Sequence, residues 1–230
     1  MSDSPIKVFL ASTSPRRHKI LLEAGIPHVL RSSQVDESLE PDLLNNPHEA
    51  AKTLAQRKAQ AVVEQELSAG YSGDAMFIGA DTMVVLDNEI YGKPKDAQEA
   101  KAMLVRLSGR THSVITAVSI WLVSAAPTAE NNDSGDIGLG FRTFYDESYV
   151  TFKPLREKDI DAYIKTGEPF DKAGGYGIQG YGKALVEKYE GSLNTIIGLP
   201  IERILADFGD MLGFSKAEKP KGLGLETMHG

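Results

Sequence analysis

The stretch IKVFLASTSPRR, residues 6–17, decides the fold class. Its first six residues form a short apolar run that ends in a Ser-rich turn, which predicts a buried strand. A helix is expected directly after the turn, because Ser14 can cap it, Pro15 suits the first helical position and Gly25 can end it. A strand that leads straight into a helix is typical of an α/β protein.

The remainder of the chain alternates between strand and helix patterns. Strands are expected at 29–35, 76–86, 89–91, 111–123, 141–152 and 184–189, and helices at 47–67, 97–107, 156–165 and 201–212. Turn residues alone separate several neighbouring strands, so the sheet is expected to be mixed, with helices flanking it. We predict a single domain over residues 1–214, with a surface loop at 124–140 and a flexible tail at 215–230.

The composition narrows the classes of partner. The 230-residue chain has a net charge of -7, which disfavours nucleic acid, since that affinity comes mainly from clustered Lys and Arg. It has no cysteine, so any metal must be held by oxygen or histidine. No apolar run is long enough to span a bilayer, and the first residues do not resemble a signal peptide. We therefore expect a cytoplasmic protein without a nucleic-acid or membrane partner.

The turn between the first strand and the first helix is a candidate anion site. The hydroxyls of Ser12 and Ser14, the side chains of Arg16 and Arg17 and the free N–H groups of a helix start can all donate to phosphate oxygens. A capped surface helix with two solvated arginines explains the same residues equally well. The Walker pattern is absent from the sequence, so the turn is not a P-loop.

Asp81 interrupts the apolar run 76–86, in the order Gly79-Ala80-Asp81-Thr82. An unpaired carboxylate inside an apolar strand is costly to desolvate, so its position implies a cation or a metal as partner. Alternatively, Asp81 lies on the wet face of a half-exposed strand, or at a bend made by Gly79. We favour a functional role, because a buried charge in a cleft is typical of an active site.

Three lysines and a glycine-rich segment add candidate ligand contacts. Lys58 lies within the long predicted helix, whereas Lys93 and Lys172 lie beside Pro or Gly in tight segments. Any one of them alone is more often a solvated surface lysine. The glycines between 174 and 180 allow the backbone to approach a ligand closely, and Gln179 offers an acceptor and donors for a nucleobase edge.

Acidic residues after the second strand are candidate metal ligands. Asp36 and Glu37 could join Asp81 around a hard divalent cation, although a solvated acidic turn is the simpler interpretation. The five histidines show no ligand pair at helical spacing, so none is assigned to a metal.

Together these segments resemble the Maf family of nucleoside triphosphate pyrophosphatases, over residues 9–212. Six ordered segments support the resemblance: 10–17, 79–82, 92–94, 107–109, 172–180 and 198–200. No single segment is decisive, but the ordered set is specific. The loop at 124–140 is longer than is usual in bacterial members and the tail is extra, which favours a eukaryotic member.

The resemblance implies a mixed α/β fold related to inosine triphosphate pyrophosphatases, with two lobes around a cleft. It implies hydrolysis of a nucleoside triphosphate to the monophosphate and pyrophosphate, with Mg or Mn as the cofactor and often in a homodimer. The segment GYGIQG at 175–180 resembles the subgroup that prefers dTTP and UTP, whereas the sister subgroup takes methylated GTP.

Residue roles follow from the matching motifs. Asp81 looks like the catalytic carboxylate, and with Glu37 it is expected to hold the metal. Arg16, Thr82 and Gln179 resemble the positions that determine specificity. The other residues expected to bind substrate are Ser12, Arg17, Lys58, Lys93 and Lys172.

Two other functions remain open. A purine or modified-nucleotide house-cleaning pyrophosphatase would keep the chemistry and change only the base. A non-catalytic nucleotide-binding regulator of cell division would bind dTTP without releasing pyrophosphate. The retained acidic and basic residues of the predicted cleft favour an enzyme.

Overall fold

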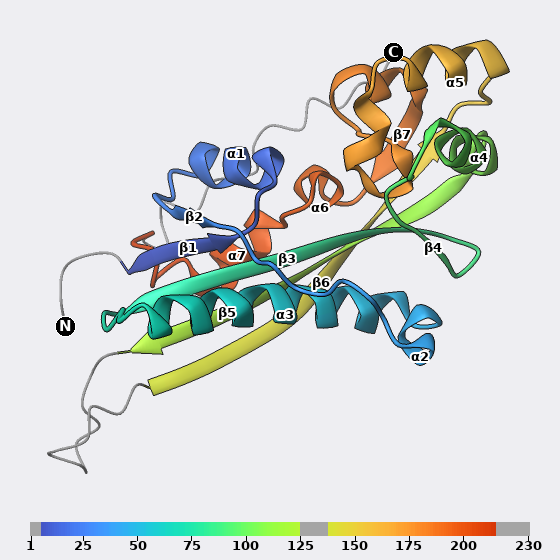
Figure 1. The fold of residues 1–230 in the computed structure, drawn as a ribbon. Helices are drawn as coiled ribbons and strands as arrows, with labels where there is room; N and C mark the ends of the chain where they lie inside the picture. The colour runs from blue at the N-terminus through green and yellow to red at the C-terminus, as the bar shows by residue number, and fades with distance from the viewer. Residues whose placement is uncertain (1–5, 125–137, 215–230) are drawn as a thin grey trace, which may run out of the picture.

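A seven-stranded mixed sheet organises the fold in the computed structural model, which describes residues 6–124 and 138–214 (Figure 1). Its strands are β1 (Lys7–Ala11), β2 (Val29–Arg31), β3 (Ala75–Leu86), β4 (Glu89–Tyr91), β5 (Thr111–Ser124), β6 (Gly138–Phe152) and β7 (Val186–Glu190). The order is β2-β1-β3-β5-β6-β7, with β4 beside β3. β1 runs parallel to β2 and β3, and the other pairs are antiparallel, which confirms the predicted mixed α/β sheet.

The central strand β3 has a short open edge. β5 pairs with one side of β3 from Ala75 to Val85, while β1 pairs with the other side only as far as Gly79. β4 pairs with that second side from Val84 to Leu86. Residues 80–83 therefore have no strand neighbour there among the residues that the structure describes.

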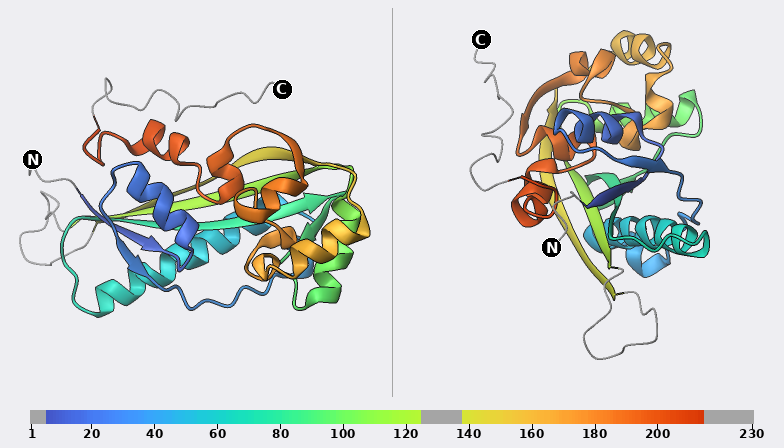
Figure 2. Two further views of the ribbon diagram at one scale, coloured as in Figure 1. Left: turned by 90° about the horizontal axis from the view of Figure 1, so that it is seen from above. Right: turned by 90° about the vertical axis from the view of Figure 1, so that its left-hand side faces the viewer.

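Helices cover both faces of the sheet (Figure 2). The long helix α3 (Pro47–Ser68) lies on one face, with the short α2 (Pro41–Leu44) before it. On the opposite face lie α1 (Pro15–Glu23), α6 (Leu193–Ile197) and α7 (Ile201–Phe208). Helices α4 (Ala97–Leu107) and α5 (Glu157–Ile164) cover the far end of the sheet, next to the 3-10 helices η1 (Glu168–Asp171), η2 (Ala173–Gly175) and η3 (Gly180–Leu185).

Gly79 allows α3 to lie directly against β3. A Cβ atom at this position would overlap the carbonyl oxygen of Ala55 and would lie 2.6 Å from the nitrogen of Ala59. Only a strand residue without a side chain permits so close an approach of the helix backbone. The same contact brings Lys58, which lies between those two alanines, over the next residue on that face of the strand, Asp81.

Most predicted elements are confirmed, with differences at their ends. Ser14 caps α1 and Asn46 caps α3, as their side chains predict. β2 is shorter than predicted, and β6 begins three residues earlier, because its Gly138 pairs with the last residue of β5. α7 ends at Phe208 instead of residue 212, and α2 and α6 are not predicted by the sequence.

Two of the sequence expectations concern regions with little or no described structure. Most of the loop expected at 124–140 and all of the tail at 215–230 lie outside the described residues. In the part of the chain that is described, no helix is both long and apolar enough to cross a membrane.

Candidate active site

A cavity of about 570 Å³ opens at the free edge of β3. It lies between the start of α1 on one side and the segment from η1 to η3 on the other. The structure brings all of the predicted site residues together in its lining: Ser12, Arg16, Arg17, Glu37, Lys58, Asp81, Thr82, Lys93, Lys172 and Gln179. These residues are spread over most of the sequence, so the fold, and not local spacing, gathers them.

Asp81 is buried and paired with Lys58. The carboxylate residue is only 9% exposed, and the Lys58 Nζ atom donates to its Oδ1 over 2.6 Å. The same ammonium group lies 2.8 Å from Oε1 of Glu37. The partner implied by a charge in an apolar strand is therefore present, and the two alternatives, a wet face and a bend at Gly79, are wrong.

Glu37 connects this ion pair to the mouth of the cavity. Its side chain is 53% exposed. Partial burial acts to raise the pKa of Glu37, but the hydrogen bond and charge of Lys58, with the charges of Lys93 and Arg17, hold that pKa below its ordinary value. The Glu37 carboxylate is thus ionised at neutral pH and faces both the lysine and the cavity.

Arg17 joins three segments of the chain. Its Nε atom donates to the carbonyl of Gly198 over 2.8 Å, one terminal nitrogen donates to Thr82 Oγ1 over 3.1 Å, and the other to Ser12 Oγ over 3.4 Å. Burial lowers the pKa of Arg17, and the charge of Asp81 raises it. The guanidinium fork therefore fixes the α1 turn relative to β3 and to the loop before α7.

A buried hydroxyl chain continues from Thr82. The Thr116 hydroxyl donates to the carbonyl oxygen of Thr195 over 2.7 Å, and it also lies 2.9 Å from the Thr82 hydroxyl. Because the Thr116 proton is used, Thr82 must be the donor between these two hydroxyls. Thr82 also accepts from Arg17, so its hydroxyl connects the buried chain to the guanidinium group.

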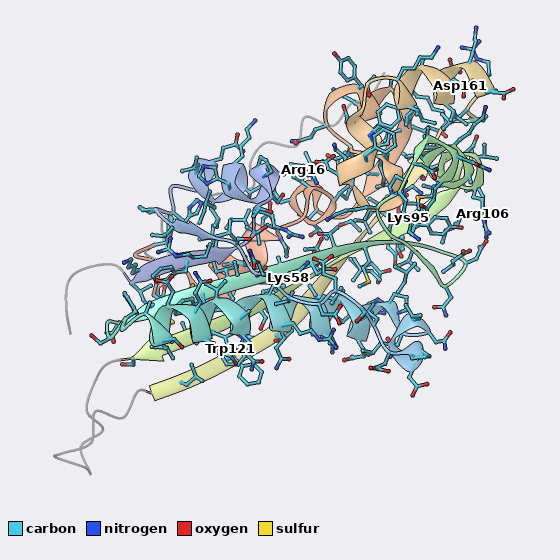
Figure 3. All side chains as sticks on the ribbon, in the orientation of Figure 1. Arg16, Lys58, Lys95, Arg106, Trp121 and Asp161 are labelled. Carbon is cyan, nitrogen blue, oxygen red and sulfur yellow. The ribbon has the colours of Figure 1, made fainter. Side chains whose placement is uncertain are left out.

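Arg16 reaches across the cavity to the opposite wall. It contacts the Asp171 carboxylate at 3.0 Å, and Lys172 lies on the same carboxylate at 2.5 Å (Figure 3 labels Arg16). Partial burial acts to raise the pKa of Asp171, while its hydrogen bonds to Lys172 and Arg16 lower it. This ion cluster connects α1 with the segment that contains Gln179.

The cavity is locally cationic in a protein with a net negative charge. Five basic and four acidic side chains line it; of the basic ones, Lys58 is buried and Arg17 is half-buried. Lys93, which follows β4, and Gln179, which lies between η2 and η3, are exposed residues of the cavity lining. A polyphosphate suits this arrangement, because several fixed donors converge where bulk water is partly excluded.

Glu37 and Asp81 are two carboxylates that one ammonium group holds together beside the cavity. Among the described residues, no group of three His, Cys, Asp or Glu side chains is arranged to hold a metal ion. Magnesium commonly takes only one or two protein carboxylates together with substrate phosphates. Lys58 Nζ lies between the two carboxylates, so its ammonium group is the cation that pairs with both of them in this structure.

Sequence reasoning missed several residues of this site. Thr116 gives no local signal, because a β-branched residue in a predicted strand is ordinary. Thr195 lies in α6, which the sequence does not predict. Glu168 and Asp171 stand beside the recognised motif at 172–180, and that proximity is the signal that could have found them.

Comparisons with known proteins identify the family of the chain. Residues 7–210 match the sequence model of a family described as Maf-like protein. The chain is 44% identical over 199 residues to a protein of Bacillus velezensis named dTTP/UTP pyrophosphatase, covering 86% of this chain and 93% of the relative. Proteins with the same name from Desulfitobacterium hafniense and Symbiobacterium thermophilum are 45% and 42% identical over 195 and 207 residues. These alignments cover 85% and 88% of this chain, and 81% and 94% of the two relatives.

Proposed function

The chain belongs to the Maf family, and we propose that it hydrolyses dTTP or UTP to the nucleoside monophosphate and pyrophosphate. The observation that supports this proposal most directly is the Asp81 carboxylate, buried at the open edge of β3 among basic side chains. The names of the relatives, which match most of the chain, support the substrate and the reaction.

Asp81 acts as the base for the attacking water. Lys58 donates to Oδ1, which leaves Oδ2 to accept a proton as the water oxygen attacks the α-phosphorus. The bond between that phosphorus and the bridging oxygen breaks, and pyrophosphate leaves. General-base catalysis of this kind requires a carboxylate within hydrogen-bond reach of the water, which a cavity at the strand edge permits.

The basic side chains hold the phosphates and stabilise the charge on the leaving pyrophosphate. Arg16, Lys93 and Lys172 line the cavity and can each contact phosphate oxygens. Phosphoryl transfer depends mainly on positioning and on electrostatic stabilisation. Arg17 supports this arrangement because its hydrogen bond to Thr82 fixes the turn before α1 to β3.

A divalent cation, Mg or Mn, completes the proposed site. Glu37 and Asp81 would hold it together with the substrate phosphates. When bound, such an ion neutralises phosphate charge and polarises the phosphoryl oxygen. Lys58, which contacts both carboxylates, keeps them oriented in its absence.

Pyrophosphate release from dTTP, UTP, ITP and methylated GTP, each with Mg or Mn, tests the reaction and the base preference together. We expect dTTP and UTP to be the preferred substrates. Faster release from ITP or methylated GTP would support the house-cleaning alternative. Binding of dTTP without any pyrophosphate would support the non-catalytic regulator.

Asp81→Asn tests the catalytic assignment. The amide keeps the volume of the carboxylate but accepts a proton poorly, so turnover should fall about a hundredfold or more. Asp161→Asn on α5 is the matched control, because Asp161 pairs with Lys101 outside the cavity. Near-normal turnover in a folded Asp81→Asn protein would refute the assignment.

A further inference from the structure

The segment 177–182 folds around the side chain of Glu168, the first residue of η1. Its Oε1 atom accepts from the Tyr163 hydroxyl at 3.0 Å and from the Gly182 N–H at 3.2 Å. Its Oε2 atom accepts from the Tyr181 N–H at 3.0 Å. One half-buried carboxylate thus binds two consecutive backbone groups at the end of the glycine-rich segment.

Tyr163 holds the other end of the same segment. Its hydroxyl accepts from the Gly177 N–H over 3.2 Å while it donates to Glu168. Burial raises the pKa of Tyr163, so the hydroxyl keeps the proton that it donates. A Cβ atom at Gly182 would overlap the Gly177 carbonyl oxygen, which shows that the two ends of the segment touch.

The three donors to the Glu168 carboxylate are neutral, and the nearby lysine does not join them. Lys172 Nζ contacts the backbone carbonyl of Glu168 at 2.7 Å and the carboxylate of Asp171. Gly180 has a positive φ of 66°, and a Cβ there would lie 2.7 Å from Glu168 Oε2. The Glu168 carboxylate therefore fills the inside of a closed turn that only glycine can form at this position.

Gln179 lies within this closed turn and faces the cavity. A side-chain amide can present either its acceptor or its donors to a ligand, so it selects between bases only when its position is fixed. Uracil and thymine present a donor at N3, whereas cytosine presents an acceptor at that position. A turn that moved would let the Gln179 amide adapt to both.

We propose that Glu168 is a positioning residue that fixes Gln179 and thereby determines discrimination between uracil-type bases and cytosine. This inference rests on the proposed nucleotide hydrolysis and deepens it. Glu168 lines the cavity, but both of its carboxylate oxygens contact the turn and the Tyr163 hydroxyl, so it acts on the base through them.

Glu168→Gln tests the proposal with almost no change in volume. The new amide group places a donor against a backbone donor, at either Tyr181 or Gly182, so at least one hydrogen bond of the turn is lost. The ratio of kcat/KM for dTTP to that for dCTP should fall about tenfold, mainly through KM, while kcat for dTTP changes less. Glu187→Gln, an exposed change on β7 outside the cavity lining, should leave the ratio unchanged.

A purely structural role would lower the melting temperature without moving the dTTP to dCTP ratio, and that result would overturn the proposal. If Glu168→Gln does not fold, Tyr163→Phe serves in its place, since it removes one hydroxyl from the same turn and should shift the ratio in the same direction. An unchanged ratio in that variant overturns the proposal equally. A wild-type protein that releases no pyrophosphate from any nucleotide would instead refute the proposed function, and the positioning role with it.

Discussion

Gly79→Ala should lower the melting temperature modestly and kcat strongly, because Gly79 is the residue of β3 that α3 contacts directly. The added Cβ would overlap the Ala55 carbonyl oxygen and lie 2.6 Å from the Ala59 nitrogen and 2.9 Å from the Ala59 Cβ. Ordinary non-bonded contacts are about 3.5 Å or longer, so α3 must move away from β3 by roughly 1 Å. Both of the atoms nearest to the new methyl group belong to helix backbone and cannot rotate away.

The displacement acts directly on the ion pair of the site. Lys58 follows the helix, so its Nζ–Oδ1 distance to Asp81, now 2.6 Å, should lengthen beyond hydrogen-bond range. Overpacking of a core contact costs about 1–3 kcal/mol of unfolding free energy. In a protein of this size the melting temperature should therefore fall by roughly 5 °C. A misplacement of about 1 Å near the reacting atoms can cost on the order of a hundredfold in kcat.

Thermal unfolding and steady-state pyrophosphate release, measured on the same preparation, check both expectations. Gly140→Ala is the matched control: it also adds a methyl group to a strand glycine, but nothing lies within 4 Å of the new atom. That control should keep its stability and its kcat. If Gly79→Ala folds and retains more than half of the wild-type kcat, the helix contact does not position Lys58 and the reasoning is refuted.

Two further changes test a residue of the cavity wall and a buried histidine. Arg17→Lys removes the planar fork that joins Gly198, Ser12 and Thr82, so kcat/KM for dTTP should fall about tenfold or more; an unchanged value in steady-state kinetics would contradict that role. Burial lowers the pKa of His112 to about 4 from its ordinary 6.5, so between these pH values the unfolded chain binds a proton that the folded chain does not. The contribution of His112 to the unfolding free energy should therefore fall by up to about 3 kcal/mol as the pH drops from 6.5 to 4. In urea titrations the stability difference between wild type and His112→Gln should narrow over this window, whereas a constant difference would argue against the shift.

Local signals predicted the helices and strands well, because they depend on neighbouring residues. Ser14 and Asn46 cap their helices through side-chain contacts to nearby N–H groups, which any sequence window contains. The predicted start of β6 is wrong because it depends on pairing: Gly138 and Gly140 carry no strand signal, and the partner β5 extends the strand over them. Boundaries set by a distant partner cannot be found from a local pattern.

The candidate site is predictable from the sequence where a residue is costly to bury without a partner. A carboxylate among apolar residues required a cation, and Lys58 supplies it. The link between Arg16 and Asp171 spans 155 positions and follows from the fold alone. Glu168 was missed for a related reason, since its role depends on how residues 177–182 turn back onto it. A sequence can show that a buried charged group needs a partner, but it rarely shows which distant residue is that partner.

The motif Gly79-Ala80-Asp81-Thr82 connects the two faces of the sheet, because side chains alternate along a strand. Gly79 and Asp81 face α3, where the helix contact supplies Lys58. Ala80 and Thr82 face the side of α1, where Ala80 packs into the core and Thr82 accepts from Arg17. In a fully paired strand these two polar side chains would be kept apart by the sheet. The open edge at 80–83 lets both reach one cavity, so the early end of β1 at Ala11 is as necessary to the site as the residues themselves.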